Sequence, residues 1–305
     1  MPWRRIFYFI GLAIGLTLFI RQVWIGYGSL QNHQFVLVHP AYLWGALACY
    51  LVGYLVQILA WSVIMRALNA PLALSQAFQG YLLSFLPRYI PGTIWGYLSR
   101  NEWLAQHCGV GYATSSLASI LEASTLLLTV GLFAIIYLIA VPWKLLAMLV
   151  CVGILWLNWW MVPRLARYFS KGRWQIQLND QYFTLLWLAG NILYLLFWGI
   201  EGAALLLIGR ALGTLGDATL LTGAFSASTA WAIGFLVLFV PTGLGVREAT
   251  LSTLLTRFTQ TLTGQAGTIA ILSRLVLICA ELLLVLFALP WHFLRPRTQH
   301  KPFKR

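Results

Sequence analysis

Six long apolar stretches constrain the fold of this chain more than any other feature. A helix needs about 20 mostly apolar residues to cross the hydrocarbon core of a bilayer. The stretches of this length are 6–25, 41–65, 114–140, 144–162, 183–209 and 267–290. Only 9% of all residues are charged, which is too few for a water-soluble surface. We therefore expect an all-α, polytopic membrane protein that forms one integral domain over residues 1–305 and has no nucleic-acid partner.

Two further apolar segments, about 75–104 and 218–258, are interrupted near their centres. Proline removes a backbone donor and clashes with the preceding turn, and glycine adds backbone freedom, so together they end a helix. The residues predicted to break these two segments are Pro91, Gly92, Pro241, Gly243 and Gly245. We expect both segments to re-enter the membrane without crossing it. The alternative is that the prolines only kink ordinary spans.

The basic residues predict the orientation. With Arg4 and Arg5 inside and both broken segments re-entrant, 12 Lys and Arg residues fall inside and only 3 outside. This asymmetry follows the positive-inside rule. If 218–240 crossed fully, the basic C-terminal tail would lie outside unless the polar stretch 246–263 also crossed. The sequence thus predicts a multi-pass protein of the cell membrane with cytoplasmic N- and C-termini, whose first stretch is a retained span and not a cleaved signal peptide.

A weak internal repeat follows from this topology. Each unit consists of a span, a broken segment and a second span, over about 41–140 and 183–290. The first span of unit one runs from outside to inside, whereas that of unit two runs from inside to outside, so the units are inverted. Inverted repeats with broken helices that meet near the bilayer centre are typical of transporters.

Ionisable side chains at membrane depth are expensive, so each is a functional candidate. Candidate substrate-binding residues are Arg247, Glu248, Arg274, Glu281, Glu122, Glu201, Arg88 and Arg100. The arginine fork suits a phosphate group, and the carboxylates would act as counter-ions or proton carriers. Three alternatives remain open. The charges could form internal ion pairs, Glu248 could only cap a helix start, and Arg88 and Arg100 could snorkel to the interface.

The sequence gives no support for enzyme chemistry or for a cofactor. The chain has two aspartates, Asp180 and Asp217, and its five histidines lie in loops or tails without metal-ligand spacing. The glycine-rich break lacks the Lys and Ser/Thr of a phosphate-binding loop. The four cysteines form no pair or cluster typical of a disulfide or a metal site. We expect no catalysis, no metal and no cofactor.

The two breaks carry a resemblance to a known family. Residues 86–93 (Leu-Pro-Arg-Tyr-Ile-Pro-Gly-Thr) and 240–249 (Val-Pro-Thr-Gly-Leu-Gly-Val-Arg-Glu-Ala) resemble the membrane region of the lysylphosphatidylglycerol synthase family. That family includes the flippase domain of the bacterial multiple peptide resistance factor. The resemblance implies movement of a lipid with a charged headgroup between leaflets, and similar stand-alone members are linked to polyprenyl-phosphate sugar pathways. Without a soluble aminoacyltransferase domain, the chain is not expected to make lysylphosphatidylglycerol.

Three hypotheses follow. The leading one is a flippase-like transporter whose partners are membrane lipids, with Arg247 and Arg274 holding a phosphate-bearing headgroup. The second is a non-catalytic scaffold or accessory subunit of a lipid-linked glycosylation enzyme, which would bind through the loop 164–181. The third, an intramembrane lipid-modifying enzyme, lacks any nameable nucleophile and base.

Overall fold

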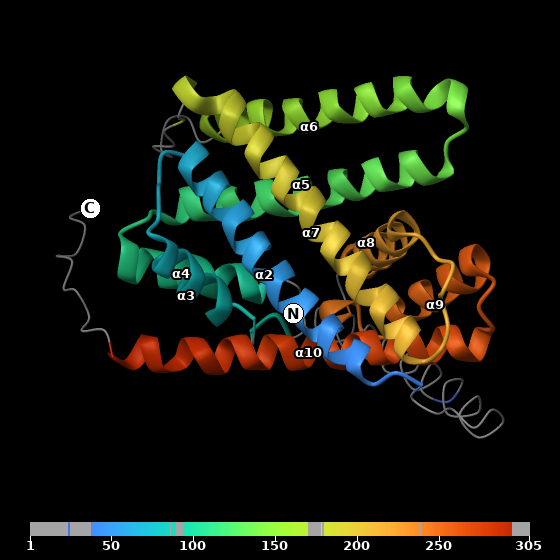
Figure 1. Ribbon diagram of the computed structural model, residues 1–305. Coiled ribbons are helices and arrows are strands. Elements are labelled where there is room, and N and C mark those ends of the chain that lie inside the picture. The colour runs from blue at the N-terminus through green and yellow to red at the C-terminus, as the bar shows by residue number, and fades with distance from the viewer. Residues whose placement is uncertain are drawn as a thin grey trace, which may run out of the picture.

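The computed structural model of the protein describes residues 24, 38–85, 87–89, 94–169, 178, 180–237 and 240–294, and these residues form helices and connecting turns without strands (Figure 1). The α-helices are α2 (Ala41–Ala67), α3 (Leu74–Leu83), α4 (Trp95–Cys108), α5 (Tyr112–Leu138), α6 (Val141–Phe169), α7 (Phe183–Ala211), α8 (Leu220–Leu236), α9 (Val246–Thr259) and α10 (Thr263–Leu294). Three short 3₁₀ turns are η1 (Pro87–Tyr89), η2 (Asp180–Tyr182) and η3 (Pro241–Gly243).

Five of the described helices are long and apolar enough to cross a bilayer, namely α2, α5, α6, α7 and α10. They correspond to five of the six predicted spans, and the sixth, 6–25, lies outside the described residues except for Trp24. The chain is therefore a multi-pass membrane protein. Helix α6 continues through Pro163 to Phe169, so Arg164 and Arg167 lie on its last turns and not in a loop. Arg164 donates to the carbonyl oxygen of Trp160 at 2.8 Å, one turn earlier on the same helix.

Each predicted broken segment consists of two helices separated by a 3₁₀ turn. The first is α3–η1–α4, and the second is α8–η3–α9. Gly243 and Gly245 have φ angles of +66° and +78°, a backbone region that glycine enters without steric cost. The second break therefore falls where the sequence predicted it. Pro91 and Gly92, predicted to break the first segment, lie outside the described residues.

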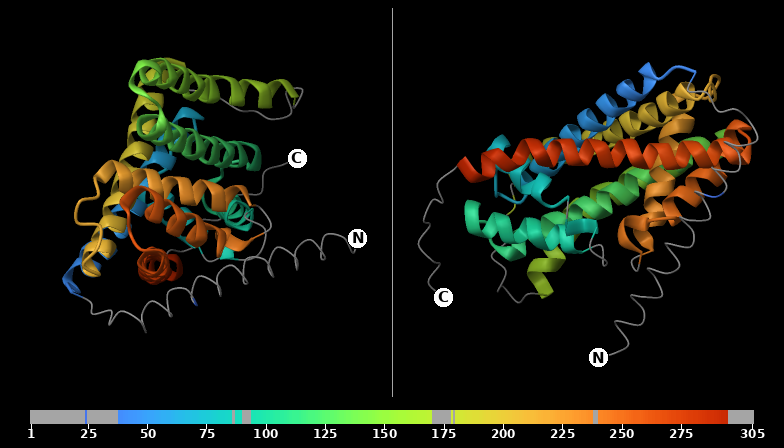
Figure 2. Two further views of the ribbon diagram at one scale, coloured as in Figure 1. Left: turned by 90° about the vertical axis from the view of Figure 1, so that its right-hand side faces the viewer. Right: turned by 90° about the horizontal axis from the view of Figure 1, so that it is seen from below.

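The first helices of the two predicted units lie side by side and antiparallel. The backbone N–H of His39, just before α2, donates to the carbonyl oxygen of Ala211 at the end of α7 at 3.2 Å. Helices α5 and α10 also run in opposite directions (Figures 1 and 2). The α3–α4 pair lies near the start of α5, and the α8–α9 pair lies near the start of α10. Turns η1 and η3 contact one another, so the two breaks meet inside the molecule.

Small residues and polar bonds fix the helices around this meeting point. Helix α7 approaches α8 so closely that a Cβ atom on Gly202 would lie 2.3 Å from the backbone nitrogen of Ala224. The indole N–H of Trp198 on α7 donates to Thr129 Oγ1 on α5 at 3.1 Å. Close backbone approach and interhelical hydrogen bonds are the means by which membrane helices associate, because burial of apolar surface gives little gain in lipid.

Candidate functional site

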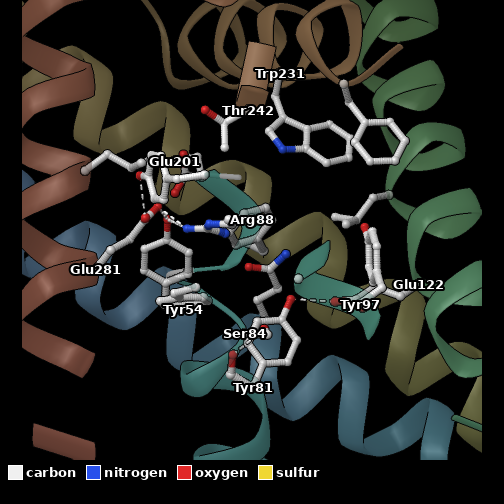
Figure 3. Close-up of a pocket in the computed structure, with 18 of the residues that line it drawn as sticks. Tyr54, Tyr81, Ser84, Arg88, Tyr97, Glu122, Glu201, Trp231, Thr242 and Glu281 are labelled. Carbon is white, nitrogen blue, oxygen red and sulfur yellow. Dashed lines mark hydrogen bonds and ion pairs between the residues drawn. The ribbon is translucent and has the colours of Figure 1, made fainter. Parts of the chain in front are cut away.

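A cavity of about 140 Å³ lies where the two broken segments meet (Figure 3). Seven of the eight predicted binding residues line it: Arg88, Arg100, Arg247, Arg274, Glu122, Glu201 and Glu281. Tyrosine and other aromatic rings form much of the remaining wall: Tyr54, Tyr81, Phe85, Tyr89, Tyr97, Phe197, Trp231 and Phe235. The sequence thus predicted most of the charges that line the cavity, but not Tyr54, Tyr81 or Tyr97.

The four arginines are each paired with one glutamate. The first pair joins Arg88 of η1 to Glu281 of α10, and in Figure 3 Arg88 points toward this carboxylate. Tyr54 also donates to Glu281, and Tyr89 does so at 2.6 Å. The guanidinium of Arg88 lies 4.3 Å from the ring centre of Phe85. This pair connects the break of unit one to the last helix of unit two.

The second pair is deeply buried. Arg100 Nη2 lies 2.5 Å from Glu122 Oε2, and both side chains are only 2% exposed. Tyr81 donates to the other oxygen of Glu122 at 2.5 Å. The guanidinium lies 4.4 Å from the ring centre of Trp61, a favourable cation–π contact. Arg100 therefore does not snorkel to the interface, and its contacts are those of an internal ion pair.

The third pair, Arg247 with Glu201, is loose. Arg247 Nη2 lies 3.8 Å from Glu201 Oε2, too far for a hydrogen bond. Glu201 Oε1 is buried and has no hydrogen-bond partner. The Arg247 side chain is 12% exposed, against 4% for that of Glu201. Of the four arginines, Arg247 is therefore the one that a ligand could bind with the least loss of existing hydrogen bonds.

The fourth pair lies behind the second break. Glu248, predicted as a substrate-binding residue, instead accepts the backbone N–H of Gly245 at 2.6 Å and caps the start of α9, in agreement with the alternative interpretation of this residue. Its other oxygen lies 3.7 Å from Arg274 Nε, and Glu248 does not line the cavity. Arg274 also donates to Thr242 Oγ1 in η3. Arg274 and Glu281, both on α10, line the cavity but pair with different partners.

Two groups near the first break lie away from the cavity wall. Glu102 is on the exposed side of α4, where Tyr112 and Gln106 each donate to it at 2.5 Å. These hydrogen bonds lower the pKa of the Glu102 carboxyl from its usual value. Trp95, the first residue of α4, is 45% exposed. Neither residue is part of the cavity lining.

The cavity wall is strongly charged, with more cationic than anionic side chains. Its lining carries four guanidinium groups and three carboxylates. Thr242 adds a hydroxyl from the break itself, where its φ of +50° is unusual for a residue other than glycine. In the described part of the chain, no three His, Cys, Asp or Glu side chains gather as metal ligands would.

Comparison with known proteins gives one match. The model of the family described as "Lysylphosphatidylglycerol synthase TM region" matches residues 8–284. No curated protein matches the chain. No solved structure matches it either.

Proposed function

The chain belongs to the family of the lysylphosphatidylglycerol synthase transmembrane region, and from this premise we propose that it is a flippase-like transporter of the cell membrane. Its substrate is a lipid with a phosphate-bearing headgroup, which it moves between leaflets without chemical change. The observation that carries this proposal is the convergence of four arginines and three glutamates on one cavity between two broken helical segments.

The proposed topology makes the two broken segments re-entrant, one from each side of the membrane. Three observations support it: α2 and α7 are antiparallel, α5 and α10 run in opposite directions, and η1 contacts η3. An inverted repeat arranged in this way would give one central site a gate on either side. The N- and C-termini would then be cytoplasmic.

The headgroup would occupy the cavity while the acyl or polyprenyl tails stay in lipid. Arg247 and Arg274 would bind its phosphate, because neither makes a hydrogen bond to its carboxylate partner and both line the cavity. Arg88, in turn η1 of the first broken segment, would be the third arginine to bind the phosphate. Arg100 would act indirectly, since Glu122 and the Trp61 ring already hold it in place.

Reconstitution tests the proposal. Purified protein is placed in liposomes with fluorescent phosphatidylglycerol or polyprenyl-phosphate probes, and the outer-leaflet fraction of each probe is followed over time. We expect accelerated exchange that Arg247→Ala and Glu281→Gln reduce at least tenfold, and that Arg210→Ala, at an exposed position at the end of α7, leaves intact. Folding of each variant is checked by its thermal unfolding.

The result also decides between the hypotheses. A well-folded protein that exchanges no probe would contradict the transporter and favour an accessory subunit of a lipid-linked glycosylation enzyme. Full activity of Arg247→Ala would leave the transporter standing but would remove Arg247 from the headgroup site.

A further inference from the structure

Glu201 is the least satisfied of the four paired glutamates. Glu281 accepts from Arg88, Tyr54 and Tyr89. Glu122 accepts from Arg100 and Tyr81, and Glu248 accepts from a backbone N–H. Glu201, only 3% exposed, accepts no hydrogen bond that the structure shows, and Arg247 lies 3.8 Å away.

The described neighbours of Glu201 provide no hydrogen-bond donor to its buried Oε1 atom. Across from it on α2 is Gly53, where even an added Cβ atom would lie 3.7 Å from Oε1. Helix α8, which packs on α7, has no ionisable residue. The ionisable groups that face Glu201 are Arg247 from α9, Arg88 from η1, Glu281 from α10, and Tyr50, Tyr54 and Cys49 from α2. Helix α5 adds Glu122 to the cavity, but that carboxylate is paired with Arg100.

We propose that Glu201 is a proton-binding site whose occupancy is coupled to that of the phosphate site, so that one proton crosses the membrane with each headgroup. The proposal rests on the transporter function proposed above. When a phosphate monoanion binds Arg247, Glu201 loses its nearest cation and is left as an unpaired buried charge. Such a charge is costly in a low-dielectric site.

A proton from the aqueous solution on the side to which the cavity is open then binds Glu201 Oε1 and makes the side chain a neutral carboxylic acid. The phosphate and the proton together add no net charge to the cavity, so the loaded protein crosses its conformational change without moving charge through lipid. Release of the phosphate returns Arg247 to Glu201 and expels the proton. Because binding free energies are reciprocal, a proton on Glu201 also strengthens phosphate binding.

The first test is the equilibrium distribution of fluorescent phosphatidylglycerol in proteoliposomes with an imposed pH gradient. With one proton per lipid, a gradient of one pH unit should shift the ratio of the two leaflets about tenfold, toward the alkaline side. Glu201→Gln, which has the same shape and cannot take up the proton, should abolish the shift. Glu102→Gln, on the exposed side of α4, should retain it. An equilibrium ratio is independent of any change in exchange rate.

A second measurement needs no transport. Infrared difference spectra of the purified protein, titrated from alkaline to acidic pH, should contain a carboxylic-acid band that Glu201→Gln removes and Glu102→Gln does not. If the wild type exchanges the lipid but the pH gradient does not shift the ratio between the leaflets, the proton proposal is overturned and the transporter proposal stands. If no probe is exchanged at all, the proposed transport function fails. Independently of transport, identical infrared titrations of wild type and Glu201→Gln would overturn the proton site itself.

Discussion

At the scale of single residues, the main feature of the site is that tyrosine hydroxyls donate hydrogen bonds to two buried glutamates. Tyr54 and Tyr89 donate to Glu281, and Tyr81 donates to Glu122. A hydroxyl that donates to a carboxylate stabilises the charged form and fixes its orientation. The sequence alone does not single out Tyr54 or Tyr81 among 13 tyrosines, because their donor role depends on which glutamate lies opposite.

Arg100 gives the clearest stability prediction at this scale. Arg100→Ala should lower the free energy of unfolding by about 3–5 kcal/mol, because it leaves Glu122 buried without its cation. The measurement is thermal unfolding in detergent, with the exposed Arg257→Ala as the control. The double variant Arg100→Leu/Glu122→Leu should lose less than Arg100→Ala alone. Equal losses would show that packing, and not the orphaned charge, explains the effect.

Glu102 gives a pH prediction. Its pKa is lowered in the folded protein by hydrogen bonds from Tyr112 and Gln106. A group with a lowered folded-state pKa stabilises the protein above its unfolded-state pKa, and this contribution disappears as the pH falls through the folded-state pKa. The difference in melting temperature between wild type and Glu102→Gln should therefore be small and constant from pH 7 to about pH 5, and should shrink as the pH falls below the unfolded-state pKa of about 4.3. A difference that grows on acidification would contradict this assignment.

At the scale of elements, the close contact between α7 and α8 positions the second broken segment. A Cβ atom on Gly202 would meet the backbone of Ala224 at 2.3 Å, and rigid backbone cannot yield as a side chain can. Gly199, on the same helix, has no neighbour within 4 Å of its added Cβ. One helix therefore contains both a glycine that the packing requires and one that it does not.

We expect Gly202→Ala to destabilise the protein by about 1–3 kcal/mol, the usual cost of overpacking, or more if α8 is displaced. Gly199→Ala should be neutral or stabilise by up to about 1 kcal/mol, since alanine is the better helix former. Thermal unfolding of both variants checks the prediction, and lipid exchange shows whether α8 still places its break correctly. Equal melting temperatures for the two variants would disprove the tight contact.

At the scale of the whole molecule, the proposed inverted topology predicts that the connections to the two broken segments face opposite sides of the membrane. Gly111, between α4 and α5, should be cytoplasmic, whereas Gly216, just before α8, should be external. An added Cβ atom meets nothing within 4 Å at either position, so both tolerate cysteine.

Impermeant maleimide tests this prediction on intact cells. In a background without the four native cysteines, Gly216→Cys should be labelled from outside, and Gly111→Cys should be labelled only after permeabilisation. Melting temperatures close to that of the parent are the control for folding. Labelling of both positions from the same side would exclude an inverted pair of re-entrant segments.

The sequence by itself determined the spans, the breaks and the list of charged candidates. These features are local: a span needs length and apolarity, a break needs Pro and Gly, and an ionisable residue in an apolar run has to be sheltered from lipid. Glu248 as a helix cap was predictable for the same reason, since donor and acceptor are three residues apart.

Only the tertiary structure decided which charge pairs with which, and how well. Tyr54 and Glu281 are 227 positions apart, and Arg88 reaches Glu281 across the two units. Such contacts depend on how α2, α7 and α10 pack around the meeting breaks, which no local pattern encodes. The same packing separates a tightly held Arg100, which the sequence left open as a residue at the membrane interface, from a loosely paired Arg247. The difference arises because Glu122 and the Trp61 ring contact Arg100 closely, whereas the nearest carboxylate oxygen to Arg247 lies 3.8 Å away.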